Sequence, residues 1–140
     1  MKSAGILRYS PKLLGDRESD KWWLILDCDE ELGRYYRHLY RLSTHRTHEL
    51  TRPSWKEHVT IIRDEEPADQ YKLLWERYAG YRIYFEYQHE VRNNESYYWL
   101  DVRSTFLLDL REELGLSRHP EYSLHLTIGN DVTAMHKNSD

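Results

Sequence analysis

The chain has 140 residues, of which 39% are hydrophobic and 31% are charged. This length suits one domain with a substantial core and is too short for two ordinary domains. The formal net charge of −4 argues against a broad basic surface for duplex DNA or long RNA, although a small anionic ligand needs only local positive charge. The single cysteine, Cys28, excludes an intrachain disulfide and a cysteine-based zinc site.

The sequence contains no evident targeting signal. No run of about 18 apolar residues predicts a membrane span, and the first residues lack the apolar core of a signal peptide. A cytoplasmic setting is therefore expected for a chain with one cysteine. We predict a single domain over 1–140, in which residues 1–20 form an N-terminal arm and residues 130–140 form a loose tail.

The first half of the chain predicts a strand, a helix and a second strand. Lys21–Asp27 is a dense apolar run typical of a buried strand. Glu30–Leu50 carries leucines and tyrosines at helical spacing, and Arg52-Pro53 follows this helix. His58–Arg63 is rich in β-branched residues and predicts the next strand.

The middle of the chain predicts a helix and a hairpin. Pro67–Tyr78 has aromatic and apolar residues on one side of a helix, which Gly80 ends. Tyr81–Val91 and Ser96–Arg103 alternate apolar and polar residues around Asn93-Asn94, which is typical of a hairpin.

The last elements complete an alternating order. Ser104 or Thr105 can cap a helix that runs to Leu114, and Tyr122–Gly129 predicts a final strand. The resulting order β-α-β-α-ββ-α-β indicates a mixed α/β or α+β domain with helices packed on a sheet.

Two predicted strands share one motif. His58-Val59-Thr60-Ile61 and His125-Leu126-Thr127-Ile128 both read His-apolar-Thr-Ile. Because strand side chains alternate between faces, each motif presents an imidazole beside a hydroxyl on the face opposite its apolar residues. Strict alternation also places Ile62 on the His58 face. A third His-x-Thr, His45-Arg46-Thr47, has no apolar neighbours, and we interpret it as a chance occurrence.

The paired motifs suit the cleavage of a phosphodiester. The reaction needs a base on the attacking oxygen and an acid on the leaving oxygen, and histidine can take either role near neutral pH. Threonine hydroxyls can donate hydrogen bonds to the non-bridging oxygens as charge grows on them. The hypothesis is that His58 and His125 are the acid–base pair and that Thr60 and Thr127 are the donors. No metal and no other cofactor is needed, and none is predicted.

The motif pair resembles the signatures of the 2H phosphoesterase superfamily. The residues that carry the resemblance are His58-Val59-Thr60-Ile61 and His125-Leu126-Thr127-Ile128-Gly129, which begin 67 residues apart (125 − 58). The resemblance implies an α+β, single-domain, bilobal fold. Its mainly antiparallel sheet would have two central motif strands lining a cleft, with helices packed on the outer faces.

Within that superfamily, the chain is most similar to the phage anti-CBASS phosphodiesterases. The short length, the Trp22-Trp23-Leu24 strand and the His125–Asn130 ending carry this similarity. It implies a hydrolase that degrades cyclic di- or trinucleotide messengers of bacterial immunity, such as 3′,3′-cyclic GMP-AMP, in the host cytoplasm. A ribose 2′-hydroxyl would then attack, and the product would pass through a 2′,3′-cyclic phosphate.

Four further residues are predicted to bind the substrate. Tyr9, Trp75 and Tyr122 could stack on bases, and Lys56 could supply positive charge near His58 if the strand begins early enough. Trp99 is a further candidate for stacking. Packing in the core, or a solvated surface charge, is the alternative explanation for each of these residues.

Two alternatives to the cyclic-nucleotide enzyme stay open. The same catalytic groups could act on RNA ends with 2′,3′-cyclic phosphates or on 2′,5′-oligonucleotides. A binding protein of another class could sequester a nucleotide in the same cleft without cleaving it.

Overall fold

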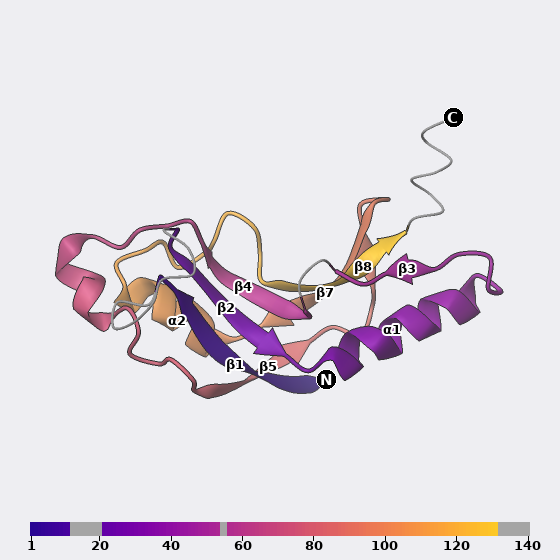
Figure 1. The fold of residues 1–140 in the computed structure, drawn as a ribbon, viewed down its shortest axis with the longest axis horizontal. Helices are drawn as coiled ribbons and strands as arrows, with labels where there is room; N and C mark the ends of the chain where they lie inside the picture. Colours follow the sequence, from indigo (N-terminus) through magenta and orange to yellow (C-terminus); the bar gives the residue numbers. More distant parts are fainter. Residues whose placement is uncertain (12–20, 54–55, 132–140) are drawn as a thin grey trace.

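The computed structural model describes residues 1–11, 21–53 and 56–131. Its elements, in chain order, are β1 (Lys2–Ser10), β2 (Trp23–Cys28), α1 (Glu30–Ser43), β3 (Leu50–Thr51), β4 (His58–Arg63), the 3-10 helix η1 (Asp69–Leu74), β5 (Arg82–Tyr87), β6 (Arg92–Asn93), β7 (Tyr97–Arg103), α2 (Thr105–Glu113) and β8 (His125–Asp131). Figure 1 shows α1 and α2 toward opposite ends of the molecule.

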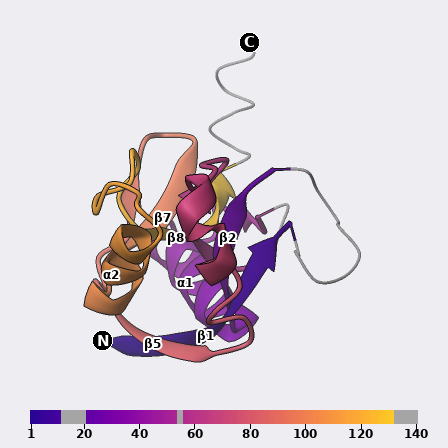
Figure 2. The same cartoon turned by 90° about the vertical axis from the view of Figure 1, so that its left-hand side faces the viewer.

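The strands form one sheet whose pairings return to their starting point. β1 pairs with β2, β2 with β4, β4 with β8, β8 with β7, β7 with β5, and β5 with β1 again, all of them antiparallel. The short β3 and β6 extend this circuit beside β8 and β7. Figure 2, turned by 90°, shows β1 beside β5 and β7 beside β8. The predicted α+β class with a mainly antiparallel sheet is confirmed.

Alternation of side chains builds one core beneath this sheet. β2 alternates half-buried and buried residues throughout, and its neighbours continue the pattern. The inward side chains join a single apolar cluster that includes Leu7, Leu26, Val59 and Leu126. Burying such side chains contributes about 1.5–3 kcal/mol each. Cys28 belongs to this core, and burial raises the pKa of its thiol to about 12.

Both helices begin at side-chain caps. Asp29 accepts a hydrogen bond from the backbone N–H of Glu31 at the start of α1, and Ser104 accepts one from Leu107 at the start of α2. Such caps satisfy N–H groups that the first turn of a helix leaves unpaired. Of the two predicted caps for α2, Ser104 is the one used. None of the helices in the described part of the chain is long and apolar enough to cross a membrane.

The predicted N-terminal arm is wrong for residues 2–10, which form β1 in the middle of the sheet. The buried residues Leu7 and Tyr9 alternate with the exposed Arg8. Because Leu7 and Tyr9 are the only buried apolar side chains of β1, the alternation of apolar and polar residues is too short to predict a strand. The rest of the predicted arm, apart from Met1 and Pro11, lies outside the described residues.

Other predicted segments differ in their bounds or type. The helix predicted over Pro67–Tyr78 is a 3-10 helix over Asp69–Leu74, and α1 ends at Ser43 because residues 45 and 46 turn with positive φ. The predicted hairpin is split, since β5 ends at Tyr87 and β6 pairs with β7 across the asparagine turn. Of the predicted tail, residues 130 and 131 belong to β8, and residues 132–140 lie outside the described residues.

The backbones of β3 and β8 approach closely at Gly129, and a substitution there tests this contact. A Cβ at this position would overlap the Thr51 carbonyl oxygen, a backbone atom that cannot move aside cheaply. We expect Gly129→Ala to lower the free energy of unfolding by about 3 kcal/mol, measured by urea denaturation. Gly80→Ala is the matched control, because Gly80 has φ +80° with no atom within 4 Å of a built Cβ, and it should cost only about 1 kcal/mol. Equal losses would contradict the close approach.

Candidate active site

The two motif strands meet at one residue pair. Val59 of β4 lies opposite Leu126 of β8 in an antiparallel register, and both side chains are 0% exposed. One step along this register brings Thr60 opposite His125, and one step the other way brings His58 opposite Thr127. The four predicted catalytic residues therefore lie together on the face opposite the core, and all are half-buried: His58, Thr60, His125 and Thr127. We call this face the motif face.

Each motif imidazole is oriented by a hydrogen bond to the backbone carbonyl two residues before it. Nδ1 of His58 lies 2.7 Å from the carbonyl oxygen of Lys56, and Nδ1 of His125 lies 2.7 Å from that of Ser123. A carbonyl oxygen can only accept, so Nδ1 carries the hydrogen in each ring. Nε2 is then the nitrogen of each neutral ring that can take up a proton.

A β-bulge lies at the isoleucine that ends each motif. Against β2, Ile25 pairs with Thr60 and Leu24 with Ile62, so Ile61 is an extra residue in β4. β8 has the same irregularity at Ile128, between the pairs of β7 with Thr127 and Gly129. A bulge shifts the alternation of the strand that carries it. The prediction that Ile62 shares the His58 face is therefore wrong, because Ile62 is 0% exposed.

The carbonyl of the first bulge is held by a buried arginine from α2. Nη1 of Arg111 donates to the Ile61 carbonyl oxygen at 2.8 Å. The guanidinium also binds Glu65 with two hydrogen bonds of 2.8 Å each, while the Arg111 side chain is only 1% exposed. Hydrogen bonds from this guanidinium lower the pKa of the Glu65 carboxyl.

A second arginine, on α1, holds the carbonyl of the other bulge. Nη1 of Arg37 donates to the Ile128 carbonyl oxygen at 2.9 Å and to Oε1 of Glu57 at 2.6 Å. The Glu57 side chain is 0% exposed and directly precedes the first motif. The helix that follows β2 thus supports β8, and the helix that follows β7 supports β4. This reciprocal arrangement gives the site an approximate two-fold relation between its halves.

The strands that flank β4 and β8 each place an aspartate opposite a motif histidine. Asp27 of β2 lies opposite His58, and Asp101 of β7 lies opposite His125. An arginine binds each of them: Arg8 to Asp27 at 2.6 Å and Arg92 to Asp101 at 3.4 Å. Each imidazole therefore has a carboxylate on the neighbouring strand of the motif face.

A cavity of about 130 Å³ opens on the motif face. Its walls include Thr60, Arg63, Glu65, Tyr122 and His125. The first motif contributes Thr60 and Ile61 to this cavity and the second contributes His125, while His58 and Thr127 lie outside its lining.

Two of the residues predicted to bind substrate lie in the core instead. Trp75 is 0% exposed, and its indole N–H donates to the Pro11 carbonyl oxygen at 3.0 Å. Tyr9 is 5% exposed and packs edge-on against Trp75, with ring centroids 5.1 Å apart. No open ring face is left for a nucleobase, so the structure contradicts a stacking role for both residues. Tyr9 is buried because it belongs to β1, a strand that the sequence did not predict.

The other two predicted residues have different surroundings. Tyr122 is 59% exposed and lines the cavity. Lys56 is exposed, but β4 begins only at His58, so strand alternation does not place its side chain on the motif face. Its backbone carbonyl is what orients His58.

Trp99, a further candidate from the sequence, and Arg63, which the sequence did not single out, also lie at the motif face. Trp99 pairs with Thr127, and its ring centroid lies 6.2 Å from that of His125. Its indole N–H donates to Asp101 at 3.2 Å. Arg63 lines the cavity only because the bulge turns it onto the motif face, and no sequence pattern indicated this bulge.

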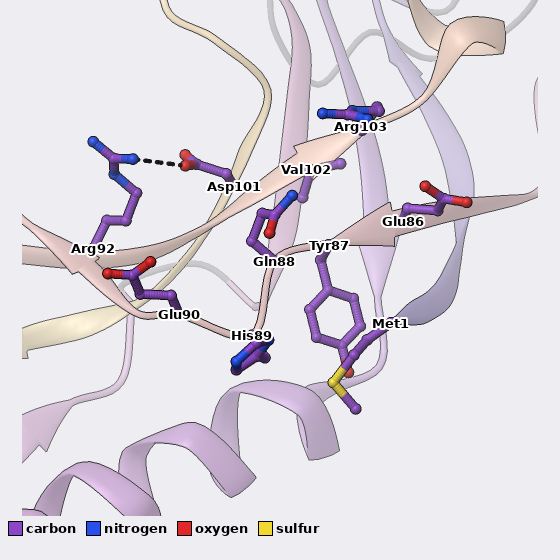
Figure 3. A pocket seen from close by; sticks show the side chains of 10 residues that line it. All are labelled: Met1, Glu86, Tyr87, Gln88, His89, Glu90, Arg92, Asp101, Val102 and Arg103. Atoms are coloured by element: carbon purple, nitrogen blue, oxygen red, sulfur yellow. Dashed lines mark ion pairs between the residues drawn. The ribbon is translucent and has the colours of Figure 1, made fainter.

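A larger cavity, of about 420 Å³, lies beside β5 and β7 (Figure 3). Its lining includes Glu86, His89, Glu90 and Arg103, together with the ion pair between Arg92 and Asp101. None of the motif residues reaches it. Within the described ranges, no group of three or more histidine, cysteine or acidic residues is placed to hold a metal ion.

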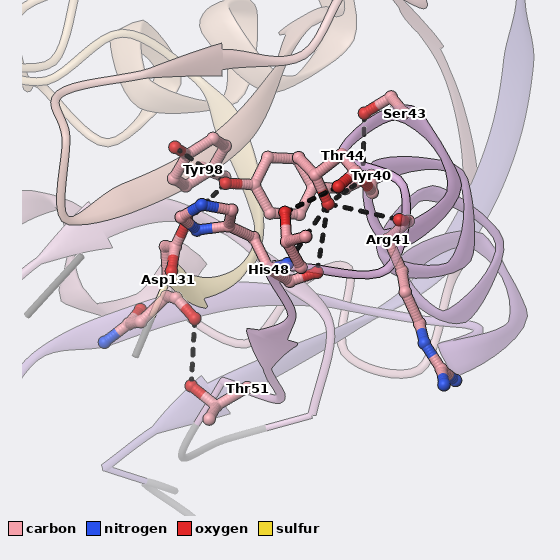
Figure 4. A network of polar contacts seen from close by, with 10 residues as sticks. Tyr40, Arg41, Ser43, Thr44, His48, Thr51, Tyr98 and Asp131 are labelled. Carbon is pink, nitrogen blue, oxygen red and sulfur yellow. Dashed lines mark hydrogen bonds and ion pairs between the residues drawn. The ribbon is translucent and has the colours of Figure 1, made fainter. Parts of the chain in front are cut away.

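A polar network fastens the far end of β8 to α1 (Figure 4). The buried Asp131 carboxylate accepts a hydrogen bond from the Tyr40 hydroxyl and lies 3.2 Å from Nδ1 of His48. The Tyr98 hydroxyl lies 3.2 Å from that of Tyr40. Burial, followed by the bond to Asp131, raises the pKa of Tyr40. The third His-x-Thr precedes His48 in an exposed turn, where His45 and Arg46 have positive φ.

In comparisons with known proteins, no family model, no curated protein and no solved structure matches this chain.

The ion pair beneath the first bulge gives a pH-dependent prediction. Because its pKa is lowered from 4.5 in the folded chain, Glu65 contributes stability that is fully present above pH 4.5 and is lost as the pH falls below that value. At pH 7 we expect Glu65→Gln to lower the free energy of unfolding by about 1–2 kcal/mol. The difference from wild type should shrink at pH 3, measured by thermal melting. A difference that is independent of pH would contradict the ion pair with Arg111.

Proposed function

We propose that the chain is a metal-independent phosphodiesterase that hydrolyses cyclic oligonucleotide messengers, such as 3′,3′-cyclic GMP-AMP, to linear products. The observation that supports this most is the matched pair of imidazoles on adjacent antiparallel strands, each with Nδ1 bonded to the carbonyl two residues earlier. Such an enzyme would counteract the bacterial defence that depends on these messengers. The proposal includes the bilobal 2H phosphoesterase fold, for which the reciprocal helices and paired bulges are supporting evidence.

The reaction needs one histidine in each protonation state. The neutral imidazole takes a proton at Nε2 from the attacking hydroxyl, and the protonated imidazole gives one to the leaving oxygen. With a ribose 2′-hydroxyl as the attacking group, the first product is a 2′,3′-cyclic phosphate, which water then opens. The near two-fold relation of His58 and His125 suits a phosphorus atom between them, because attack and departure occur on opposite sides.

The threonines act on the non-bridging oxygens. Thr60 lies across from His125 and Thr127 across from His58, so each hydroxyl is close to the imidazole of the other strand. Hydroxyl donors fixed beside the phosphate stabilise the charge that develops in the transition state. Trp99, next to His125, offers a partly exposed ring for a base.

Removing either imidazole should abolish most turnover. We expect His58→Ala and His125→Ala each to lower kcat/KM for 3′,3′-cyclic GMP-AMP by about 10²–10⁴-fold, measured by chromatography of the products in the presence of EDTA. The matched control is His45→Asn in the third His-x-Thr, since asparagine tolerates the positive φ of 54° at that position. Activity that EDTA removes, or that survives both substitutions, would overturn the proposal.

The threonines should contribute less than the histidines. Thr60→Val and Thr127→Val keep the shape of the side chain and remove one donor each, so we expect a loss of about 10–10³-fold in kcat with a small change in KM. Steady-state kinetics separates the two constants. A loss confined to KM would assign the hydroxyls to ground-state binding instead.

The rate should pass through a maximum as the pH changes. One imidazole must be neutral and the other protonated, so kcat/KM should fall on both sides of a maximum near neutral pH. A rate that stays constant between about pH 5 and 9 contradicts paired imidazoles. The same assay separates the rival functions: stoichiometric binding with full recovery of intact ligand indicates a sponge, and preferred cleavage of 2′,3′-cyclic RNA ends or 2′,5′-linked oligonucleotides indicates the RNA enzymes.

A further inference from the structure

Arg63 reaches the motif face because of the bulge at Ile61. Thr60 pairs with Ile25 and Arg63 pairs with Trp23, two positions that share one face of β2. Without the extra residue, Arg63 would point to the side of Val59. The bulge therefore adds a cation to the face that carries the first motif.

Two aromatic rings hold the Arg63 guanidinium at the cavity. Its central carbon lies 5.5 Å from the ring centroid of Trp23 and 5.5 Å from that of Tyr122. Cation–π contacts fix the position of a guanidinium and leave its N–H groups available in its own plane. Arg63 thus differs from Arg8, Arg37 and Arg111, each of which binds a carboxylate. Among the described residues, no carboxylate forms an ion pair with Arg63.

The charges around the cavity leave this cation available for an anion. Glu65 also lines the cavity, but both of its carboxylate oxygens are bound by Arg111. Glu121 is the other acidic residue in the lining, and it faces solvent. Thr60 and His125 share the cavity with Arg63, so an anion bound to Arg63 would belong to a molecule that also reaches the motif residues.

We propose that Arg63 binds a second phosphate of the substrate, distinct from the one that is cleaved. This inference rests on the proposed function and assigns a binding residue to the second phosphate that every cyclic oligonucleotide carries. Arg63 follows Thr60 by three residues, one of them the bulge residue, so the two phosphates would bind about 7–10 Å apart along the strand. A planar guanidinium can donate two parallel hydrogen bonds to a phosphate. Cyclic dinucleotides satisfy this requirement, whereas a dinucleoside monophosphate lacks the second group.

A pair of matched substrates tests the proposal. 3′,3′-cyclic GMP-AMP has two phosphates, and the linear dinucleoside monophosphate GpA has the same bases with a single phosphodiester. We expect Arg63→Gln to lower kcat/KM for the cyclic compound by about 10–100-fold, mainly through KM. The loss for GpA should be at least ten times smaller. Arg63→Lys keeps the charge without the planar fork and should fall between Arg63→Gln and wild type.

Arg82→Gln is the control for loss of an exposed arginine. Its guanidinium carbon lies 5.6 Å from the ring centroid of Tyr84 on β5, so it shares the ring contact but not the cavity. It should change neither constant by more than about two-fold, and thermal melting should show that Arg63→Gln is folded. Equal losses for the two substrates, or no loss for either, would overturn the role of Arg63.

Measuring how tightly the protein binds the cyclic compound distinguishes a failure of the Arg63 proposal from a failure of the enzyme proposal. If the wild-type chain binds the cyclic compound but does not cleave it, the enzyme proposal fails. The Arg63 proposal then stands only if Arg63→Gln weakens binding about 10–100-fold by calorimetry. If wild type binds neither compound, both proposals fail.

Discussion

Two arginines, the buried Arg111 and the half-buried Arg37, determine how the motif strands are shaped. A β-bulge removes a backbone group from the ladder, and an unpaired carbonyl in the core costs about 1–3 kcal/mol. Arg111 satisfies the carbonyl of Ile61, and Arg37 satisfies that of Ile128. Because each guanidinium also binds a glutamate, its charge is compensated within the protein. Each bulge is thereby stabilised at a fixed position, directly after the threonine of its motif.

The positions of the bulges decide which side chains reach the motif face. Before the bulge, alternation places the histidine and threonine outward and Val59 or Leu126 inward. The bulge residue and the residue after it are both buried, and the next residue returns to the motif face. On β4 that residue is Arg63, and on β8 it is Asn130, so the two halves differ in charge at equivalent positions. The two motif strands therefore have nearly the same backbone geometry, but one carries a cation after its bulge and the other a neutral amide.

The motifs and their alternation could be predicted because they depend only on local periodicity. His58 and His125 each sit in a β-branched or apolar run that has little alternative to a strand. The bulges could not be predicted, since they depend on arginines 50 residues away from Ile61 and 91 residues away from Ile128. The shared isoleucine after each threonine was visible in the sequence, but it read as a further core position. It is in fact the extra residue of each bulge.

The roles of the aromatic residues could be predicted least well from the sequence. With twelve tyrosines and five tryptophans in the chain, composition cannot separate rings that fill the core from rings that meet a ligand. Trp75 is covered because η1 folds back over Tyr9 and Trp22, a tertiary contact that no local pattern encodes. Tyr122 is exposed because it lies in the loop before β8.

Because α1 supports β8 and α2 supports β4, the chain cannot be divided before β7 without separating each motif strand from its helix. A fragment that ends before β7 would retain β4 but lose Arg111, and the remaining piece would retain β8 but lose Arg37. Neither piece contains both a motif strand and the helix that completes its hydrogen bonding. Division before β7 therefore separates each motif strand from the arginine that completes it, and we expect the two pieces to restore these hydrogen bonds only as a complex.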